Sequence, residues 1–177
     1  MSQPSEIDLS SFIRSIPDYP KPGILFRDIT PLLASAEAFA ATTSRLADHY
    51  QDAGIDLVVA VEARGFLFAG PIAEKLNAGL TPVRKPGKLP FKTISQSYDL
   101  EYGTDTLEMH VDGVAPGLKV LVVDDLLATG GTVGACCKLL EDAGAIIAGC
   151  CFVVELAGLQ GRKKLGSHEA FSLITYE

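Results

Sequence analysis

The chain has 177 residues, which suffices for one domain with a sizeable core, and with 47% hydrophobic and 21% charged residues its composition is that of an ordinary globular protein. A formal net charge of −7 argues against nucleic acid and anionic membrane surfaces as principal partners, because both are bound largely through clustered Lys and Arg. We therefore expect residues 1–177 to form a single domain, with residues 1–35 as an appendage to the core.

Cysteine spacing and hydropathy indicate the compartment. The four cysteines are the adjacent pairs Cys136–Cys137 and Cys150–Cys151, and neither pair has the C-x-x-C spacing of a metal site. No apolar stretch approaches the roughly 20 residues that span a bilayer, and the first ten residues lack the features of a signal peptide. These observations predict buried thiols in a cytoplasmic protein that does not bind or span a membrane.

The first elements in chain order are short and separated by turn residues. The Pro-rich residues 17–23 predict an irregular surface segment, and residues 36–50 predict a helix. The apolar run 57–61 predicts a buried strand. Residues 68–77 carry apolar side chains at helical spacing, and residues 80–84 predict the next strand.

Residues 85–105 interrupt this alternation of strands and helices. The segment contains several Pro and Gly residues and no convincing helix, although residues 95–100 and 106–110 could pair as a short hairpin. A segment of this length in a compact domain is more often a lid or a binding loop than a linker. We expect it to move.

The alternation resumes after this segment. Residues 120–123 predict a second buried strand, and residues 132–143 predict a helix that Gly144 closes at its C-cap. Further strands are predicted at residues 146–155 and 171–175. The whole pattern predicts an α/β fold with a central, mainly parallel sheet flanked by helices.

The strand at residues 120–123 leads into the most informative motif of the sequence. Two adjacent carboxylates, Asp124 and Asp125, stand at its C-terminal end, where ligands bind in open α/β sheets. A loop then turns through two glycines into a helix N-terminus, whose free N–H groups favour an anion. The loop consists of Ala128, Thr129, Gly130, Gly131 and Thr132.

This order of residues predicts that sugar and phosphate bind together. The loop would hold a phosphate group, with the hydroxyls of Thr129 and Thr132 as extra donors. Asp124 and Asp125 would accept hydrogen bonds from sugar hydroxyls or hold a hydrated metal ion through water. The alternative is that the glycines only form a tight turn. No Lys follows them, so the loop is not a nucleotide-triphosphate P-loop.

Residues 120–132 resemble the phosphoribosyl-pyrophosphate signature of the type I phosphoribosyltransferases. Five further segments resemble the adenine-specific branch of that family, in its order and at about its spacing, and matches extend from about residue 7 to residue 177. These segments are residues 22–31, 62–66, 84–90, 100–103 and 154–156.

The resemblance implies a fold and a reaction. The fold would be of the type I phosphoribosyltransferase kind, with residues 1–35 as a small hood that binds the base and residues 85–105 as a long mobile catalytic loop. The reaction would be a step of purine salvage, in which adenine and 5-phosphoribosyl-1-pyrophosphate (PRPP) give AMP and pyrophosphate. It further implies Mg2+ as a cofactor and a homodimer.

The resemblance also assigns roles to individual side chains. Arg64 and Lys85 match the family's contacts to pyrophosphate, and a guanidinium fork suits that group. Glu101 and Tyr102 match the catalytic loop, where Glu101 would exchange a proton with a purine nitrogen and Tyr102 would shield the site. The alternatives are a surface ion pair for Arg64 and a solvated carboxylate for Glu101.

Adenine recognition rests on the family alone. The resemblance places the base between Phe26 and Leu156, with its edge read by Arg27 and the backbone of Leu25. Stacking on an aromatic ring suits a purine. From the sequence by itself, Phe26 and Leu156 are better explained as core residues.

Two other functions compete with this one. A regulator that only senses PRPP is disfavoured by the acidic charge and by the retained Glu101–Tyr102 pair. A transferase for xanthine, guanine or orotate is disfavoured by the segments around Phe26 and Arg64, which resemble the adenine branch. The three histidines stand apart in the sequence and receive no catalytic role.

Overall fold

The computed structural model describes residues 7–99 and 103–177. It contains two compact units, Met1–Arg45 and Leu46–Glu177, and each is described by itself. Among the described residues, no helix is both long and apolar enough to cross a bilayer.

The first unit is a hairpin followed by helices. After the 3-10 turn η1 (Leu9–Phe12), the strands β1 (Arg14–Pro17) and β2 (Leu25–Asp28) pair antiparallel. The helix α1 (Thr30–Ala34) starts where the buried Asp28 accepts a hydrogen bond from the backbone N–H of Thr30 at 2.9 Å. The helix α2 (Ala36–His49) runs across the boundary between the two units. The irregular segment predicted at residues 17–23 forms the turn of the hairpin.

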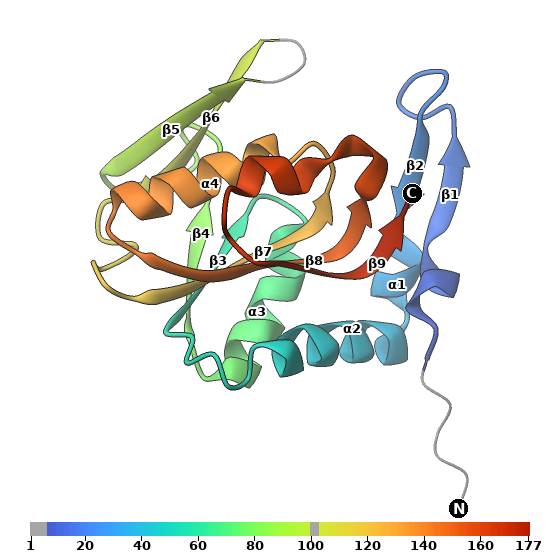
Figure 1. The fold of residues 1–177 in the computed structure, drawn as a ribbon, viewed down its shortest axis with the longest axis horizontal. Helices are drawn as coiled ribbons and strands as arrows, with labels where there is room; N and C mark the ends of the chain where they lie inside the picture. Colours follow the sequence, from blue (N-terminus) through green and yellow to red (C-terminus); the bar gives the residue numbers. More distant parts are fainter. Residues whose placement is uncertain (1–6, 100–102) are drawn as a thin grey trace, which may run out of the picture. The chain divides into compact units, whose positions relative to one another are not determined.

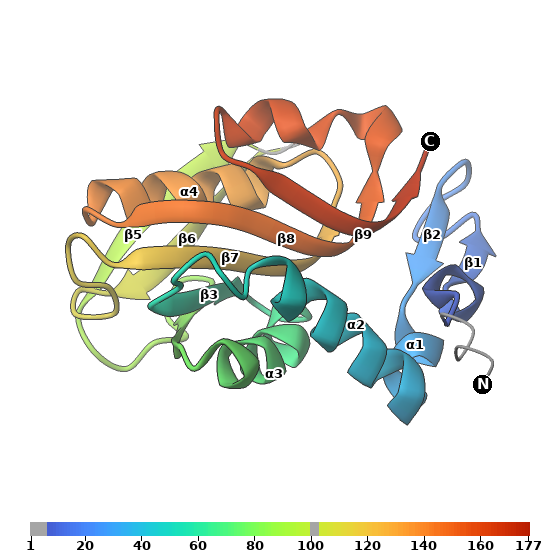
Figure 2. The ribbon, with the colours of Figure 1, turned by 60° about the horizontal axis from the view of Figure 1, so that its bottom comes forward.

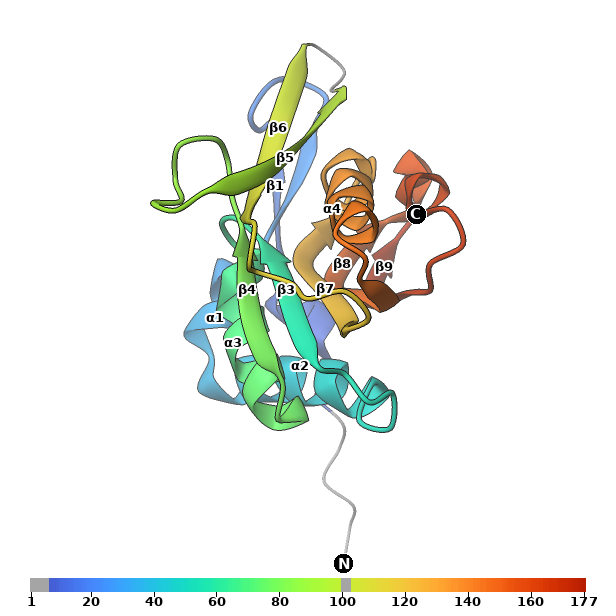
Figure 3. The ribbon, with the colours of Figure 1, turned by 90° about the vertical axis from the view of Figure 1, so that its left-hand side faces the viewer.

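The second unit is built on a five-stranded parallel sheet with the strand order β4-β3-β7-β8-β9. The helices α3 (Gly65–Leu76) and α4 (Gly131–Asp142) cover opposite faces of this sheet (Figures 2 and 3). Side chains such as Val59, Val122 and Phe152 are fully buried between these layers. The predicted parallel α/β architecture is confirmed. The strands are β3 (Leu57–Val61), β4 (Gly79–Val83), β7 (Lys119–Leu127), β8 (Ile146–Leu156) and β9 (Ala170–Tyr176).

A separate two-stranded hairpin lies beside α4 (Figures 1 and 3). It is formed by β5 (Thr93–Asp99) and β6 (Thr104–His110), which pair antiparallel as predicted. Two short 3-10 turns, η2 (Ala157–Leu159) and η3 (Gly161–Leu165), connect β8 to β9.

At the carboxyl edge of the sheet, β7 and α3 extend beyond the ranges that the sequence pattern indicates. β7 continues four residues beyond Val123, because β8 keeps pairing with it through Leu127. α3 begins at Gly65 rather than Phe68, directly after β3 and the short turn that carries Arg64. The extension of β7 brings Asp124 and Asp125 onto a regular strand, and the earlier start of α3 makes Arg64 the N-cap of that helix.

Candidate active site

The site lies at the point in the sheet where the strand order reverses. From β3 the chain passes to β4 on one side, while β7, β8 and β9 follow on the other side of β3. In parallel sheets, ligands bind at the carboxyl ends of strands where the connections diverge in this way. The residues after β3 and the end of β7 therefore face a common crevice.

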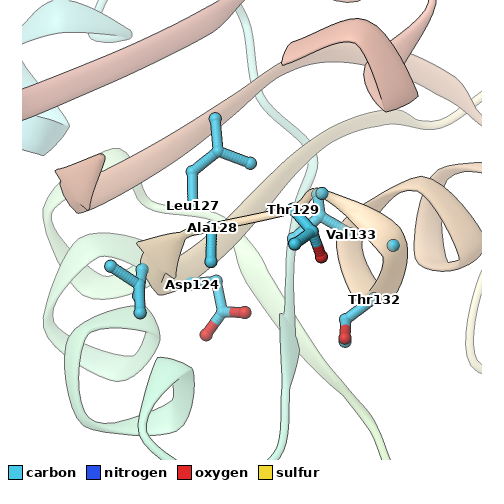
Figure 4. A pocket seen from close by; sticks show the side chains of 9 residues that line it. Asp124, Leu127, Ala128, Thr129, Thr132 and Val133 are labelled. Atoms are coloured by element: carbon cyan, nitrogen blue, oxygen red, sulfur yellow. The ribbon is translucent and has the colours of Figure 1, made fainter. Parts of the chain in front are cut away.

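The predicted phosphate loop encloses a cavity of about 90 Å³. Residues 128–132 line it together with Asp124, and Figure 4 shows the oxygens of Asp124, Thr129 and Thr132 on one side of the loop, with Leu127 on the other. Gly130 is the N-cap of α4, and no side chain makes a capping hydrogen bond there. A helix N-terminus without a side-chain cap has backbone N–H groups that can bind an anion.

The turn η3 packs against the backbone of the predicted phosphate loop, residues 128–132. Gly130 has φ +76°, and a Cβ atom there would overlap the carbonyl oxygen of Gly161. A Cβ atom on Gly161 would in turn overlap the carbonyl oxygen of Ala128. The two backbones therefore touch because both positions lack a side chain.

An ion pair fixes η3 to the sheet. Arg162 donates two hydrogen bonds of 2.6 Å to the carboxylate of Glu155 on β8 and a third to the carbonyl oxygen of Ala170 on β9. The Arg162 hydrogen bonds lower the pKa of Glu155 below its usual value. This carboxylate stays charged in its buried position at the end of β8.

The acid pair and Arg64 form the centre of a second cavity, of about 320 Å³. Arg64, at the start of α3, contacts the carboxylate of Asp125 at 2.8 Å, and that carboxylate is only 7% exposed. Burial, and then the charge of Asp125, raise the pKa of Asp124 well above its usual range. Burial also raises the pKa of Asp125, and the Arg64 guanidinium works against that rise.

Lys85 lines the same cavity from the segment after β4. Its ammonium contacts the carboxylate of Asp105 and donates to the hydroxyl of Tyr98 at 3.1 Å. Partial burial works to lower the pKa of Lys85, but these two partners outweigh it and raise the pKa. The neighbouring Arg84 instead pairs with Glu62 at 2.8 Å.

Nine of the predicted site residues thus line two adjoining cavities that share Asp124, Leu126 and Thr132. The carboxylates available in the described part of the chain do not form a metal cage, since no group of three His, Cys, Asp or Glu side chains is arranged to hold an ion. Glu101 and Tyr102 lie outside the described residues.

The residues predicted to bind adenine fall in both units. Leu25, Phe26 and Arg27 lie on β2 of the first unit, where Phe26 makes an edge contact with Tyr19 at a centroid distance of 5.1 Å. Arg27 donates to the hydroxyl of Ser15 at 2.6 Å. Leu156 ends β8 in the second unit.

Three residues at the site were not identified from the sequence. Tyr98 and Asp105 face each other across the β5–β6 hairpin and hold Lys85, and Gly161 supports the phosphate loop. The hairpin register could have indicated that Tyr98 and Asp105 are neighbours. No local signal points from Gly161 to a loop 30 residues earlier.

The chain is similar to known proteins over most of its length. Residues 28–173 match the family model of the phosphoribosyl transferase domain. An adenine phosphoribosyltransferase of Rhodopirellula baltica is 56% identical over 170 residues, which cover 96% of this chain and 82% of that protein.

Two solved structures are similar over almost the whole chain. The crystal structure of adenine phosphoribosyltransferase from Thermoanaerobacter pseudethanolicus has 52% identity and a TM-score of 0.92, covering 95% of this chain and 98% of that chain. The enzyme from Saccharomyces cerevisiae, complexed with D-2,5-dideoxy-2,5-imino-altritol 1,6-bisphosphate and adenine, has 37% identity and a TM-score of 0.89, covering 93% and 96%.

Proposed function

Because the chain belongs to the adenine phosphoribosyltransferases of the phosphoribosyl transferase domain family, we propose that it transfers the 5-phosphoribosyl group of PRPP to adenine, giving AMP and pyrophosphate in purine salvage. One observation carries this proposal. A helix N-terminus suited to a phosphate adjoins a cavity lined by the Asp124–Asp125 pair and by two cations, Arg64 and Lys85. PRPP has the matching sequence of groups: a phosphate, a ribose diol and a pyrophosphate.

The substrate is aligned by groups with distinct tasks. The 5'-phosphate binds the amides of residues 128–132 and the hydroxyls of Thr129 and Thr132. Asp124 and Asp125 accept hydrogen bonds from the ribose hydroxyls, which only an ionised or partly ionised pair does well. Arg64 stands beside Asp125 and binds the pyrophosphate through its guanidinium group, whose planar fork suits that anion.

Catalysis consists of stabilising the leaving group and placing the base. As the bond from ribose C1 to pyrophosphate breaks, positive charge develops on the ribose and negative charge on the departing oxygen. Arg64 and Lys85 stabilise that oxygen, and the acid pair stabilises the ribose. Adenine, held by Leu25, Phe26, Arg27 and Leu156, then bonds to C1, while Glu101 takes or returns a proton and Tyr102 shields the site.

The acid pair also fits the proposed cofactor, Mg2+. This ion keeps several of its waters and binds few carboxylates directly, so two acids beside a polyphosphate suffice for it. Asp124 and Asp125 would hold its waters, and the ion would neutralise charge on the pyrophosphate.

The organisation and setting of the chain belong to the same proposal. Residues 1–177 act as one catalytic unit, with residues 1–35 as the hood and residues 85–105 as the mobile catalytic loop. We place the protein in the cytosol as a homodimer. The free, buried cysteines fit a reducing compartment, and a dimer would cover exposed apolar side chains such as Leu67, Leu80 and Phe91.

The decisive experiment is a panel of bases. Adenine, guanine, xanthine, hypoxanthine and orotate are each supplied with PRPP and Mg2+, and nucleotide formation is followed by chromatography. We expect conversion of adenine alone. Conversion of a different base would refute the base assignment, and tight PRPP binding without conversion of any base would indicate a sensor instead.

A further inference from the structure

A chain of polar contacts connects the β5–β6 hairpin to both halves of the site. The Tyr98 hydroxyl lies 3.1 Å from the Lys85 ammonium, 3.3 Å from Oδ2 of Asp105 and 3.2 Å from Oγ1 of Thr132. Lys85 also contacts Asp105 directly. Tyr98 and Asp105 are register partners on the hairpin, so their side chains share one face.

The Lys85 ammonium group has more N–H donors than its two protein partners use, so one donor remains for a ligand. An ammonium group has three donors, and Tyr98 and Asp105 engage two of them. The third donor remains on a group that lines the 320 Å³ cavity together with Arg64 and the acid pair. The two partners therefore do not compete with a ligand for Lys85.

We propose that Asp105 and Tyr98 are positioning residues that hold the Lys85 ammonium toward the pyrophosphate of PRPP, and that Tyr98 couples this cation to the phosphate loop through Thr132. The inference rests on the proposed function, because it takes Lys85 as a pyrophosphate ligand. Neither Asp105 nor Tyr98 needs to touch the substrate.

Charge and flexibility explain why a lysine needs such partners. Its four-carbon stem has many rotamers, and fixing them before the ligand arrives lowers the entropic cost of binding. The Asp105 carboxylate is 29% exposed and would repel pyrophosphate if it stood alone. Its pairing with Lys85 removes this repulsion, and the Lys85 hydrogen bond lowers the pKa of Asp105 so that the pair stays charged.

Loss of Asp105 and loss of Tyr98 should affect the binding of different ligands. Asp105 contacts Lys85 and Tyr98, so its loss should weaken ligands that carry pyrophosphate. Tyr98 also contacts Thr132, so its loss should additionally weaken ligands that carry only the 5'-phosphate. PRPP carries both groups and AMP carries only the phosphate, so the pair of ligands separates the two effects.

The test uses the full chain with Asp105→Asn and Tyr98→Phe. We expect Asp105→Asn to raise the KM for PRPP about tenfold, with kcat within about threefold, because one charge-assisted hydrogen bond is lost. Its Kd for AMP, measured by titration calorimetry, should stay within about twofold of the wild type. Tyr98→Phe should weaken both PRPP and AMP by about three- to tenfold. Asp112→Asn, in the exposed turn after β6, removes the same charge and should change neither constant.

Other results would overturn the inference. A lower KM for PRPP in Asp105→Asn would mean that Asp105 withholds Lys85 from the ligand, and an equal loss of PRPP and AMP binding with a lower melting temperature would mean a merely structural role. If Asp105→Asn does not fold, Tyr98→Phe still tests the proposal, because this variant removes only a single oxygen. Unchanged PRPP binding by Tyr98→Phe would then refute the proposal. A wild-type chain that makes no AMP would refute the proposed function itself, whereas an active wild type with indifferent variants would refute only this inference.

Discussion

Gly130 is the position at which the phosphate loop tolerates least change. Its backbone is left-handed, with φ +76°, and the carbonyl oxygen of Gly161 occupies the place of a side chain. Gly131, the next residue, has only ordinary neighbours, since a Cβ atom there would lie 3.6 Å from the Tyr98 ring. Two adjacent glycines thus carry very different constraints.

We predict that Gly130→Ala lowers the free energy of unfolding by about 2 kcal/mol or more, because both backbone strain and overlap oppose it. Gly131→Ala should stay within about 1 kcal/mol of the wild type or stabilise slightly, because it reduces the entropy of the unfolded chain. Thermal and urea denaturation of both variants measure the difference. Equal stability of the two variants would contradict the described packing of Gly130 on Gly161.

At the scale of elements, the site depends on how closely α3 approaches β7. A Cβ atom on Gly65, the first residue of α3, would lie 3.0 Å from both Oδ1 of Asp124 and the carbonyl oxygen of Val123. Asp124 cannot retreat easily, because the same Oδ1 accepts a hydrogen bond from the backbone N–H of Asp125 at 2.9 Å. The start of α3 therefore sets the position of Arg64 relative to the acid pair.

We predict that Gly65→Ala destabilises the chain by about 1–3 kcal/mol and raises the KM for PRPP, because the overpacked helix end must shift. Gly70→Ala is the matched control on the same helix, since its Cβ position meets no atom of another segment within 4 Å. Helix propensity favours alanine, whereas Pro71 disfavours a Cβ on the residue before it, so Gly70→Ala should stay within about 1 kcal/mol of the wild type. Denaturation and steady-state kinetics of the two variants test this, and a harmless Gly65→Ala would show that α3 is not the element that positions Arg64.

For the whole molecule, ligand binding and unfolding are linked. A ligand that binds only the folded chain stabilises it by RT ln(1 + L/Kd), where L is the concentration of free ligand. The phosphate loop joins β7 to α4, two elements that pack into the core of the second unit. An anion bound to this loop should therefore raise the free energy of global unfolding of the second unit.

We predict that AMP at about 100 times its Kd raises the free energy of unfolding by about 2.7 kcal/mol, which for a chain of this size corresponds to about 5–10 °C in Tm. Adenosine at the same concentration should raise Tm much less, because it lacks the phosphate that we propose the loop binds. Differential scanning calorimetry compares the two ligands. Equal shifts would place the main binding energy outside the phosphate loop.

The sequence by itself determined the local elements and the phosphate loop. The strand at residues 57–61 coincides with β3, the helix at residues 36–50 ends one residue later than α2, and the helix at residues 132–143 is shifted by one residue from α4. These predictions succeed because apolar periodicity, Gly and Asp act within a few neighbouring residues. The roles of Glu101, Tyr102 and the adenine-binding residues came from family resemblance and stay predictions.

Only the tertiary structure decided how the distant parts of the site meet. The extension of β7 through Asp124 and Asp125 depends on pairing with β8, and the contact of Arg64 with Asp125 joins residues 61 positions apart. The hold of Tyr98 and Asp105 on Lys85 requires the hairpin register and its place beside α4. Such contacts depend on packing between segments that the chain brings together only on folding, so no local pattern of residues specifies them.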